Sequence, residues 1–485
     1  MAGALPPPPS PCVFCQIAGK SSSTPLLHSD DKVVTFQDIK PAAFRHYLVI
    51  PVEHIPSVKD LRRRSEDYSL VLHMLNVGQT LLRKDAPEAE QVPRLLYEVN
   101  EKAYEPEIIS IGPYHRGKNH LNMMEVHKVR FLRMLLRRTN EHTADPYEHT
   151  AEPYVAALRG MVEKARNCYS EPSSMSTEDF LEMLVLDGCF IVEFIHQFSD
   201  GNRDEYVFGL RVNFYRIFHD LILFENQLPF FVLWELFGIM WGIERNFYVT
   251  VLLELFSGRM PGLGVDFDDD NTSIENVKHL LDLVRGKWLP SREVMEYCSR
   301  APEDANWSFI RSTTELKEAG IRFKKGEGDN LFDIKFRNGV LEIPMIKIVD
   351  STERLYRNVI ACEQFEKENP KYFTEFARFM DCLINSGKDV ELLCHCGIIE
   401  NWLGSDEAVA AMFNRLTDNV WASIKFYTQI YIDVNEYYNK PRNKRMASLR
   451  HNYFNTPWAF ISFLAAAFLL LLALLQTVFT IFPRH

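Results

Sequence analysis

The chain has 485 residues, of which 46% are hydrophobic and 25% charged, and this composition excludes a disordered or low-complexity protein. Lys and Arg number 54 against 65 Asp and Glu. The resulting net charge of −11 has the wrong sign for a protein that holds a phosphate backbone, so we expect no nucleic-acid partner. Nine scattered cysteines are too few for a disulfide scaffold and indicate a reducing compartment.

Residues 1–11 (MAGALPPPPSP) contain no cationic region followed by an apolar stretch, so we expect no secretory signal. The prolines favour an extended polyproline II conformation. A disordered lead is the expected structure, and docking of the prolines into an aromatic groove is the alternative.

Residues 12–88 combine short helical and strand patterns, which indicates a partial α/β fragment. A short helix is predicted to open at Cys12, and the stretches 32–36 and 47–50, rich in valine and aromatic residues, are predicted strands. Residues 66–84 are predicted to form a helix with Ser65 as its N-cap, and its apolar face would consist of Val71, Met74, Leu75, Leu81 and Leu82.

The segments CVFCQIAG and FQDIKPAAFRHYLVIPVEHI resemble the histidine-triad (HIT) nucleotide hydrolases and transferases, in particular their nucleoside-phosphoramidase branch. The resemblance implies that Asp38 bonds the ribose hydroxyls, with Phe36 and Ile39 close to the base. It also implies three ligands of a zinc site that some members carry, which correspond to Cys12, Cys15 and His54.

The catalytic half of this family is missing from the sequence. The family's reaction depends on a strand carrying His-x-His-x-His, whose central imidazole attacks phosphorus. This triplet occurs nowhere in the chain, and after Lys84 the sequence passes into unrelated residues. We therefore expect no enzyme activity by that mechanism, and neither zinc nor a nucleotide as a cofactor. A vestigial fragment is the plainest interpretation, and nucleotide binding without hydrolysis is the alternative.

Residues 92–455 are dominated by amphipathic stretches, which predict a mainly α-helical body. Apolar residues share one face of a helix over 121–138, namely Leu121, Met124, Phe131, Leu132 and Leu135. A capping box at Ser176-Thr177-Glu178-Asp179 opens the next long helix, which carries Phe180, Leu184, Ile191 and Ile195. Further helices are predicted at 214–227, 229–242, 274–285, 352–386, 389–402, 406–416 and 418–438. Period-two alternation on both sides of Asn338-Gly339 predicts one small β-hairpin over 332–344.

Ordered blocks across 92–482 look like the plant family called domain of unknown function 247 (DUF247). They include Val92-Pro93, SIGPYH at 110–115, DGCF at 187–190, DLILFENQLPF at 220–230 and Pro457-Trp458. The resemblance implies a plant protein with a mostly helical domain and a C-terminal single-pass anchor. Some relatives are linked to pollen–stigma recognition in grasses, and no enzymatic activity is established for the family.

Two carboxylates, Asp187 and Glu225, lie in apolar runs that should be buried. A buried carboxylate costs several kcal/mol unless it is paired or hydrogen-bonded. We therefore predict a buried polar network of Asp187 and Glu225 with the amides of Asn226 and Gln227, in which the candidate cations are Arg116, Lys128 and Arg166. A structural role is favoured over a catalytic one, because structural ion pairs also perturb pKa values.

Three patterns that suggest metal sites do not meet the spacing rules. The residues His115, His120, Glu125 and His127 lack the i, i+3 or i, i+4 spacing that would place ligands on one helix face, and structural caps are the favoured interpretation. The acidic run Asp266, Asp268 and Asp270 lacks the glycine and the bidentate glutamate of a calcium loop. Cys394-His395-Cys396 lacks the two-residue spacing of a zinc knuckle.

The stretch 458–482, which begins with Trp458 and ends with Phe482, contains no charged residue over 25 positions. At 1.5 Å per residue it would span about 37 Å, which is enough to cross a bilayer core with some tilt. We predict a transmembrane helix anchored by these two aromatic residues, and a buried helix of a soluble core is the alternative. Self-association through Ser462 and Ala466, a small-x-x-x-small pair, would give a homodimer.

Basic residues precede this stretch, and no acidic residue follows Glu436. By the positive-inside bias the bulk of the protein is predicted to be cytosolic, on a plasma membrane or endomembrane, with a short C-terminal tail. The triplets Asn271-Thr272-Ser273 and Asn306-Trp307-Ser308 would be glycosylated only if the bulk were luminal.

The sequence therefore predicts a mainly α protein with an N-terminal partial HIT fragment and a C-terminal transmembrane helix. Its predicted function is non-enzymatic recognition of other, unidentified proteins at a membrane. A catalytically dead, nucleotide-binding HIT-type sensor is the alternative.

Overall fold

We describe the protein from a computed structural model, which places residues 12–19, 24–38, 47–55, 65–85, 92–139, 150–169, 175–201, 204–205, 207, 211–242, 245–257, 277–302, 305–328, 330–365, 370–421, 425–445 and 457–481. The contacts divide the chain into two compact units. The N-terminal unit comprises Met1–Gln91 with Met161–Met175, and the main unit comprises Val92–Gly160 with Ser176–His485.

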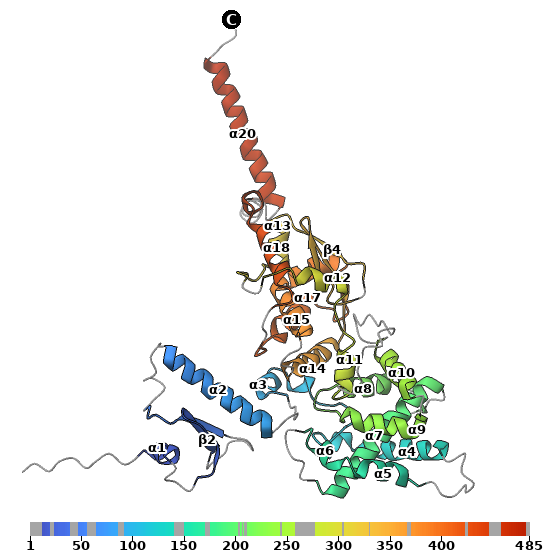
Figure 1. Ribbon diagram of the computed structural model, residues 1–485. Coiled ribbons are helices and arrows are strands. Elements are labelled where there is room, and N and C mark those ends of the chain that lie inside the picture. Colours follow the sequence, from blue (N-terminus) through green and yellow to red (C-terminus); the bar gives the residue numbers. More distant parts are fainter. Residues whose placement is uncertain are drawn as a thin grey trace, which may run out of the picture. The chain divides into compact units, whose positions relative to one another are not determined.

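The N-terminal unit contains a three-stranded antiparallel sheet in the order β1-β2-β3 (Figure 1). Its elements are α1 (Val13–Ala18), β1 (Leu26–Ser29), β2 (Val33–Gln37), β3 (Tyr47–Pro51) and α2 (Ser65–Asp85), and the short helix α6 (Val162–Arg166) is grouped with them. The helices and the two strands predicted in this region are thus present, and β1 is an additional strand that the sequence pattern did not reveal.

Helix α2 packs on β3 through an apolar face that differs from the predicted one. Val77 and Leu81 are buried against Val33 of the sheet, and the partly buried residues packed on this cluster are Tyr47, Val49, Leu70 and Met74. Leu75, by contrast, is 55% exposed, and Val71 is also exposed. The prediction for these two residues was therefore wrong. The face of the helix that packs on the sheet consists instead of Leu70, Met74, Val77 and Leu81.

The main unit is mostly helical (Figure 1). Its first half contains α3 (Arg94–Tyr97), η2 (Glu101–Ala103), η3 (Asn119–Leu121), α4 (Asn122–Thr139), α5 (Glu152–Arg159), α7 (Thr177–Asp200), α8 (Arg211–Asp220), α9 (Phe230–Trp241), α10 (Arg245–Ser257) and α11 (Leu280–Arg285). Its second half contains α12 (Arg292–Cys298), α13 (Thr313–Glu318), α14 (Thr352–Phe365), α15 (Tyr372–Leu383), α16 (Gly387–His395), α17 (Asp406–Leu416) and α18 (Thr428–Asn439), together with β4 (Arg322–Lys325), β5 (Lys335–Arg337), β6 (Val340–Ile343), β7 (Ile346–Ile348) and β8 (Ile399–Asn401).

Helix α7 is the centre of the first half, where it packs against α4, α5, α9 and α10. It begins as predicted, because the Ser176 hydroxyl accepts the backbone N–H of Asp179 at 3.1 Å. Gly188 lies where α9 approaches most closely, since a Cβ atom there would come within 2.2 Å of Leu236 Cδ1. The core face predicted over 121–138 is confirmed for the four residues that are 2% exposed or less, Leu121 at the end of η3 and Met124, Phe131 and Leu135 in α4.

The predicted β-hairpin is present as β5 and β6, which pair antiparallel around Asn338 and Gly339. Both turn residues have positive φ angles, 52° and 75°, as the two-residue hairpin turn requires. The sequence did not reveal that β4 joins β6 in parallel, nor that β7 pairs in parallel with the distant β8.

Several predicted helix boundaries were wrong. The helix predicted over 352–386 is broken into α14 and α15, because Pro370 cannot continue a helix and the Glu363 carboxylate instead accepts the N–H groups of Phe373 and Thr374 at the start of α15. The stretch predicted as helix over 389–402 ends at His395, since Gly397 takes a φ of 70° before β8 begins.

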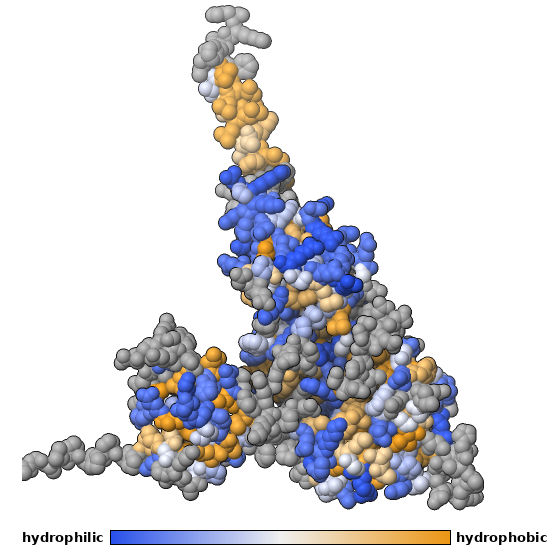
Figure 2. All heavy atoms as spheres, in the orientation of Figure 1, coloured by the Kyte–Doolittle hydropathy of each residue, from blue (hydrophilic) through white to orange (hydrophobic). Residues whose placement is uncertain are grey.

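The last helix, α20 (Pro457–Ile481), contains one window, Ile461–Val478, that is long and apolar enough to cross a membrane by length and composition. Its mean hydropathy is 2.4, and none of the window is buried. Figure 2 shows the apolar surface along this helix. Trp458 lies in α20, whereas Phe482 lies outside the described residues.

Candidate functional site

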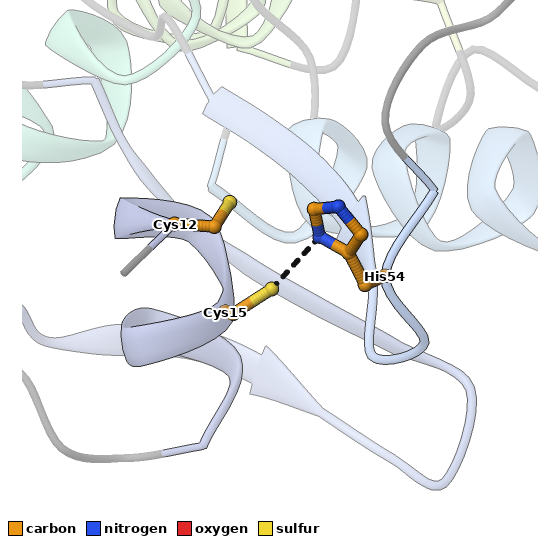
Figure 3. A group of neighbouring side chains, drawn as sticks. All are labelled: Cys12, Cys15 and His54. Carbon is orange, nitrogen blue, oxygen red and sulfur yellow. Dashed lines mark hydrogen bonds between the residues drawn. The ribbon is translucent and has the colours of Figure 1, made fainter. Parts of the chain in front are cut away.

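The side chains that the sequence assigned to zinc come together in the N-terminal unit (Figure 3). Cys12 and Cys15 belong to the turn that opens α1, and His54 follows β3. The ligand atoms of the three lie within 4.8 Å of one another, and Cys15 Sγ is 3.0 Å from His54 Nδ1. A backbone hydrogen bond from Cys15 lowers the pKa of the Cys12 thiol, while partial loss of solvent raises the pKa of the Cys15 thiol.

Two sulfurs and one imidazole nitrogen fit three corners of the tetrahedron that zinc prefers. Within the ranges that the structure places, this trio is the one set of three or more such side chains that converges, and no fourth Cys, His, Asp or Glu joins it. The donor set thus suits an open zinc site with water in the fourth position, rather than the closed site that stabilises a fold.

The residues assigned to the nucleoside lie at the end of β2. Phe36 is buried, with its ring 6.4 Å from that of Phe14, and Asp38 follows the strand and is half-buried. Ile39 lies outside the described residues. Among the residues that the structure describes, β3 pairs on one side only, with β2.

Asp30 binds two histidines in an arrangement that the sequence analysis missed. Its Oδ2 accepts from His28 Nε2 at 2.9 Å and from His73 Nε2 at 2.8 Å, and its Oδ1 accepts the N–H groups of Lys32 and Val33. The imidazole of His28 contributes most to holding the pKa of the Asp30 carboxyl well below its usual range. This carboxylate ties the β1–β2 turn to α2, so its role is structural.

In the main unit, Asp187 lies at the centre of a buried ion pair. Its Oδ1 is 2.6 Å from Lys128 Nζ, and neither side chain is exposed to solvent. The Lys128 ammonium also contacts Glu125 at 2.5 Å, and Arg116 lies 3.3 Å from Glu125 and 3.9 Å from Asp187. Complete burial raises the pKa of the Asp187 carboxyl, and the Lys128 charge opposes that rise.

This ion pair holds the backbone of the SIGPYH segment. The N–H of Gly112, whose φ is 76°, donates to Asp187 Oδ2 at 2.9 Å, and the Ser110 hydroxyl donates to Glu125 at 3.0 Å. The Ser110 hydroxyl also accepts from Lys128 Nζ at 3.3 Å, and Ser110 is buried. Arg166, the third candidate cation, donates instead to the Met175 carbonyl.

The predicted network is divided over several segments. Asn226 Oδ1 accepts the N–H of Ile111 at 2.6 Å, next to the amide held by Asp187, whereas Glu225 accepts the N–H of Val92 at 3.0 Å. Gln227 donates to the carbonyls of Leu221 and Leu223. Glu225, Asn226 and Gln227 therefore each bind backbone groups of neighbouring segments, and they do not form one cluster with Asp187.

Asp220 was not assigned a role from the sequence, although it opens the same block. It is 0% exposed and accepts the N–H groups of Glu107, Ile108 and Ile109 at 2.8–3.0 Å. Arg354 contacts it at 2.8 Å. Its signal in the sequence was the same as that of Asp187 and Glu225, a single carboxylate beside an apolar run.

The other metal-like patterns do not form sites where they can be followed. His120 Nε2 lies 3.2 Å from the Pro106 carbonyl, Glu125 is engaged by cations, and His115 is buried, which lowers its pKa to about 4. His395 Nδ1 lies 2.7 Å from the Glu391 carbonyl at the end of α16. The acidic run 266–270 lies outside the described residues.

Comparison with known proteins identifies the main part of the chain. Residues 90–472 match the DUF247 family, described as plant protein of unknown function. The chain belongs to this family. A UPF0481 protein of Arabidopsis thaliana is 29% identical over 412 residues, which cover 80% of this chain and 84% of that protein. A putative UPF0481 protein of the same plant is 24% identical over 477 residues, or 79% of this chain and 88% of that protein.

The N-terminal part is similar to different proteins. Residues 11–105 match the family described as scavenger mRNA decapping enzyme C-term binding. The bifunctional adenosine 5'-phosphosulfate phosphorylase/adenylylsulfatase HINT4 of Arabidopsis thaliana is 68% identical over 78 residues, which are 16% of this chain and 53% of HINT4. The adenosine 5'-monophosphoramidase HINT3 of Xenopus tropicalis is 44% identical over 75 residues, or 48% of its length. The DUF247 protein therefore carries a HIT-like N-terminal fragment, and this fragment spans about half of these relatives.

Proposed function

We propose that this DUF247 protein is a membrane-anchored recognition protein, in which α20 inserts into a bilayer and the main unit binds other proteins without catalysing a reaction. The observation that carries the proposal is α20 itself, with its 18-residue window of mean hydropathy 2.4 and no buried residue. Leu469, Leu470 and Leu474 are each 64–67% exposed. Removing a side chain of this size from water stabilises it by about 1.5–3 kcal/mol, so the helix gains strongly from a bilayer.

The charge beside the helix supports a cytosolic main unit. Lys440, Arg442, Lys444 and Arg445 are all exposed, and the sequence from there to α20 contains no acidic residue. Juxtamembrane Lys and Arg are retained on the cytosolic side and are attracted to its anionic lipids.

The state of the buried carboxylates supports recognition over catalysis. Glu375 Oε2 accepts the N–H groups of Lys425, Phe426 and Tyr427, and Glu363 accepts those of Phe373 and Thr374. Both carboxylates thus bind the backbone amides that precede or open a helix, which gives them a capping role in the fold. The HIT-like fragment, in turn, belongs to a chain without the His-x-His-x-His triplet.

The anchoring is tested by carbonate extraction of membranes that contain the full-length protein. We expect the protein in the pellet, and we expect the double variant Leu469→Arg/Leu470→Arg in the supernatant, because each central Arg costs about 2.5–3.5 kcal/mol in a membrane helix. Leu289→Arg is the matched control, since Leu289 is 51% exposed in the main unit and should not affect extraction. Recovery of the unaltered protein in the supernatant refutes the proposal.

The orientation is tested on the same membranes. Protease added to sealed vesicles should digest the main unit, and endoglycosidase should leave the mobility of the protein unchanged. A glycan at Asn306, which is exposed, would place the main unit in the lumen and contradict the cytosolic assignment.

A second function, binding of an adenosine nucleotide without hydrolysis, is favoured by one observation. The half-buried Asp38 directly follows β2 in a fragment that is 68% identical to HINT4. Calorimetry of the full-length protein with adenosine monophosphate should give a binding heat that is lost in Asp38→Ala. Equal heats in the two proteins, or none in either, exclude this function.

A further inference from the structure

A groove of about 650 Å³ lies between α18 and the segment that precedes α13. Its walls are formed by Asn306, Trp307 and Ser308 on one side and by Ile432, Asn435, Glu436, Asn439 and Lys440 on the other. Its volume lies in the middle of the range of about 300–1,000 Å³ found for small-ligand pockets, and the groove has one aromatic wall among convergent polar groups.

The aromatic wall is held rigidly. The Trp307 ring stacks on the buried Tyr431 with centroids 5.3 Å apart and planes 20° from parallel, and Phe309 packs edge-on against both rings. The Asn435 amide donates to the Ser308 carbonyl at 2.7 Å and so ties the segment to α18. The groove is therefore preformed and does not depend on a ligand to order it.

Three polar side chains of the groove have no hydrogen-bond partner among the described residues. Within the part of the chain that the structure describes, the side chains of Asn306, Glu436 and Asn439 form no hydrogen bond, although each lines the same 650 Å³ space. Two amides and a carboxylate offer both donors and acceptors at short range. Such a set matches a ligand with several hydroxyl groups, and an aromatic wall suits the C–H face of a ring that carries them.

A positively charged rim follows the groove directly in sequence. Lys440 lines the groove, and Arg442, Lys444 and Arg445 come after it and are exposed. Pro457, where α20 begins, is twelve residues after Arg445 (457 − 445), and a chain of that length reaches at most about 40 Å. The rim therefore stays close to any membrane into which α20 inserts.

We infer that this groove binds the headgroup of an anionic, hydroxyl-rich membrane lipid, that is, a phosphorylated inositol ring. The inference rests on the proposed membrane anchoring and names the lipid that the anchored protein contacts. The ring hydroxyls bond the amides of Asn306 and Asn439 and the carboxylate of Glu436, and the phosphates meet Lys440 and the rim. A serine headgroup offers the Glu436 carboxylate an ammonium but has no ring hydroxyls for the amides of Asn306 and Asn439, so the groove should favour the inositol ring.

The test is calorimetric titration of the full-length protein, in nonionic detergent micelles, with a short-chain phosphatidylinositol phosphate. We expect saturable binding that Lys440→Glu weakens by roughly ten-fold or more, because removal of one juxtamembrane cation is worth about five-fold and the new carboxylate adds repulsion. The double variant Asn306→Ala/Asn439→Ala should weaken it by at least about five-fold without lowering the melting temperature, since neither side chain has an internal partner. Lys388→Glu, an exposed lysine at α16, is the matched control and should bind normally.

Three outcomes would overturn the inference. The first is equal affinity for short-chain phosphatidylserine, with no effect of the asparagine variant, which would reduce the groove to a basic patch. The second is equal affinity for free inositol phosphate, which would make the ligand soluble rather than a lipid. The third is that the protein stays in the membrane pellet after carbonate extraction but does not bind the phosphatidylinositol phosphate. This result refutes the groove as a lipid site and leaves the anchoring intact. If the protein binds the phosphatidylinositol phosphate in micelles but carbonate releases it from membranes, the result supports the groove as a lipid site and refutes the anchoring.

Discussion

Replacement of Lys128 by methionine should destabilise the main unit by about 3–5 kcal/mol, because it leaves a buried carboxylate without its closest cation. The Lys128 ammonium is 2.6 Å from Asp187, and both side chains are 0% exposed. After the substitution Asp187 keeps the Gly112 amide at 2.9 Å and the Arg116 guanidinium at 3.9 Å. Methionine replaces the lysine stem with a similar volume, so the loss reports the charge rather than a cavity.

The magnitude is large enough for a thermal assay on the full-length protein in detergent. Unfolding entropy is about 2.1 cal/mol/K per residue, or about 0.7 kcal/mol/K for roughly 350 residues. A loss of about 4 kcal/mol therefore lowers Tm by about 5–6 °C. The matched control is Arg292→Met, which removes a cation from the exposed Arg292–Glu296 pair and should shift Tm by less than about 1 °C.

Two further measurements make the result specific to the ion pair. The double variant Lys128→Met/Asp187→Asn should recover most of the loss, because asparagine is neutral and still accepts the Gly112 amide. The deficit of Lys128→Met should also shrink as the pH falls, since burial raises the pKa of Asp187 and protonation removes the unpaired charge. Equal Tm shifts for Lys128→Met and Arg292→Met, or no recovery in the double variant, would refute the reasoning.

Other positions give independent predictions. Gly188→Val should lower the free energy of unfolding by about 1–3 kcal/mol, because its Cβ would lie 2.2 Å from Leu236 Cδ1, and a raised Tm would contradict this. Gly339→Ala should cost about 1–2 kcal/mol in a urea titration, because φ is 75° and the new Cβ would lie 2.6 Å from the Tyr437 ring, whereas an unchanged midpoint would exclude the strain. Burial raises the pKa of Glu375 from 4.5 to about 7, so the folded state keeps a proton that the unfolded state loses. Stability should therefore fall by about 1.4 kcal/mol per pH unit between about pH 5 and 7, with a slope that Glu375→Gln lacks, and parallel pH profiles of the two proteins would disprove the shift.

The elements that could be predicted from sequence are those whose cause is local. The face of α4 follows from the spacing of its apolar residues, and the start of α7 follows from the Ser176 cap. The hairpin follows from Asn338-Gly339, because this pair favours the positive φ angles that the turn needs. In each case the residues that determine the element lie within one or two turns of each other along the chain.

The boundaries that were wrong depend on distant side chains. Helix α18 begins at Thr428 rather than near 418, because the Glu375 carboxylate of α15 binds the three amides before it. The end of α14 likewise depends on Glu363, which caps the next helix. Pro370 was a signal for that break, whereas the Glu375 contact joins residues 50 positions apart and left no trace in the local pattern.

The candidate site divides in the same way. The sequence alone determined that Asp187 and Glu225 needed partners, that the HIT nucleophile triplet is absent, and that α20 carries no charged residue, since these depend on residue type and order. Tertiary structure decided which partner each received: Lys128 of α4 faces Asp187 of α7, while Glu225 holds the amide of Val92. It also brought Trp307 and Lys440 to one groove, because packing of Trp307 on Tyr431 joins segments more than a hundred residues apart in sequence. Local chemistry sets what a side chain requires, and only the folded chain sets what lies within hydrogen-bonding distance of it.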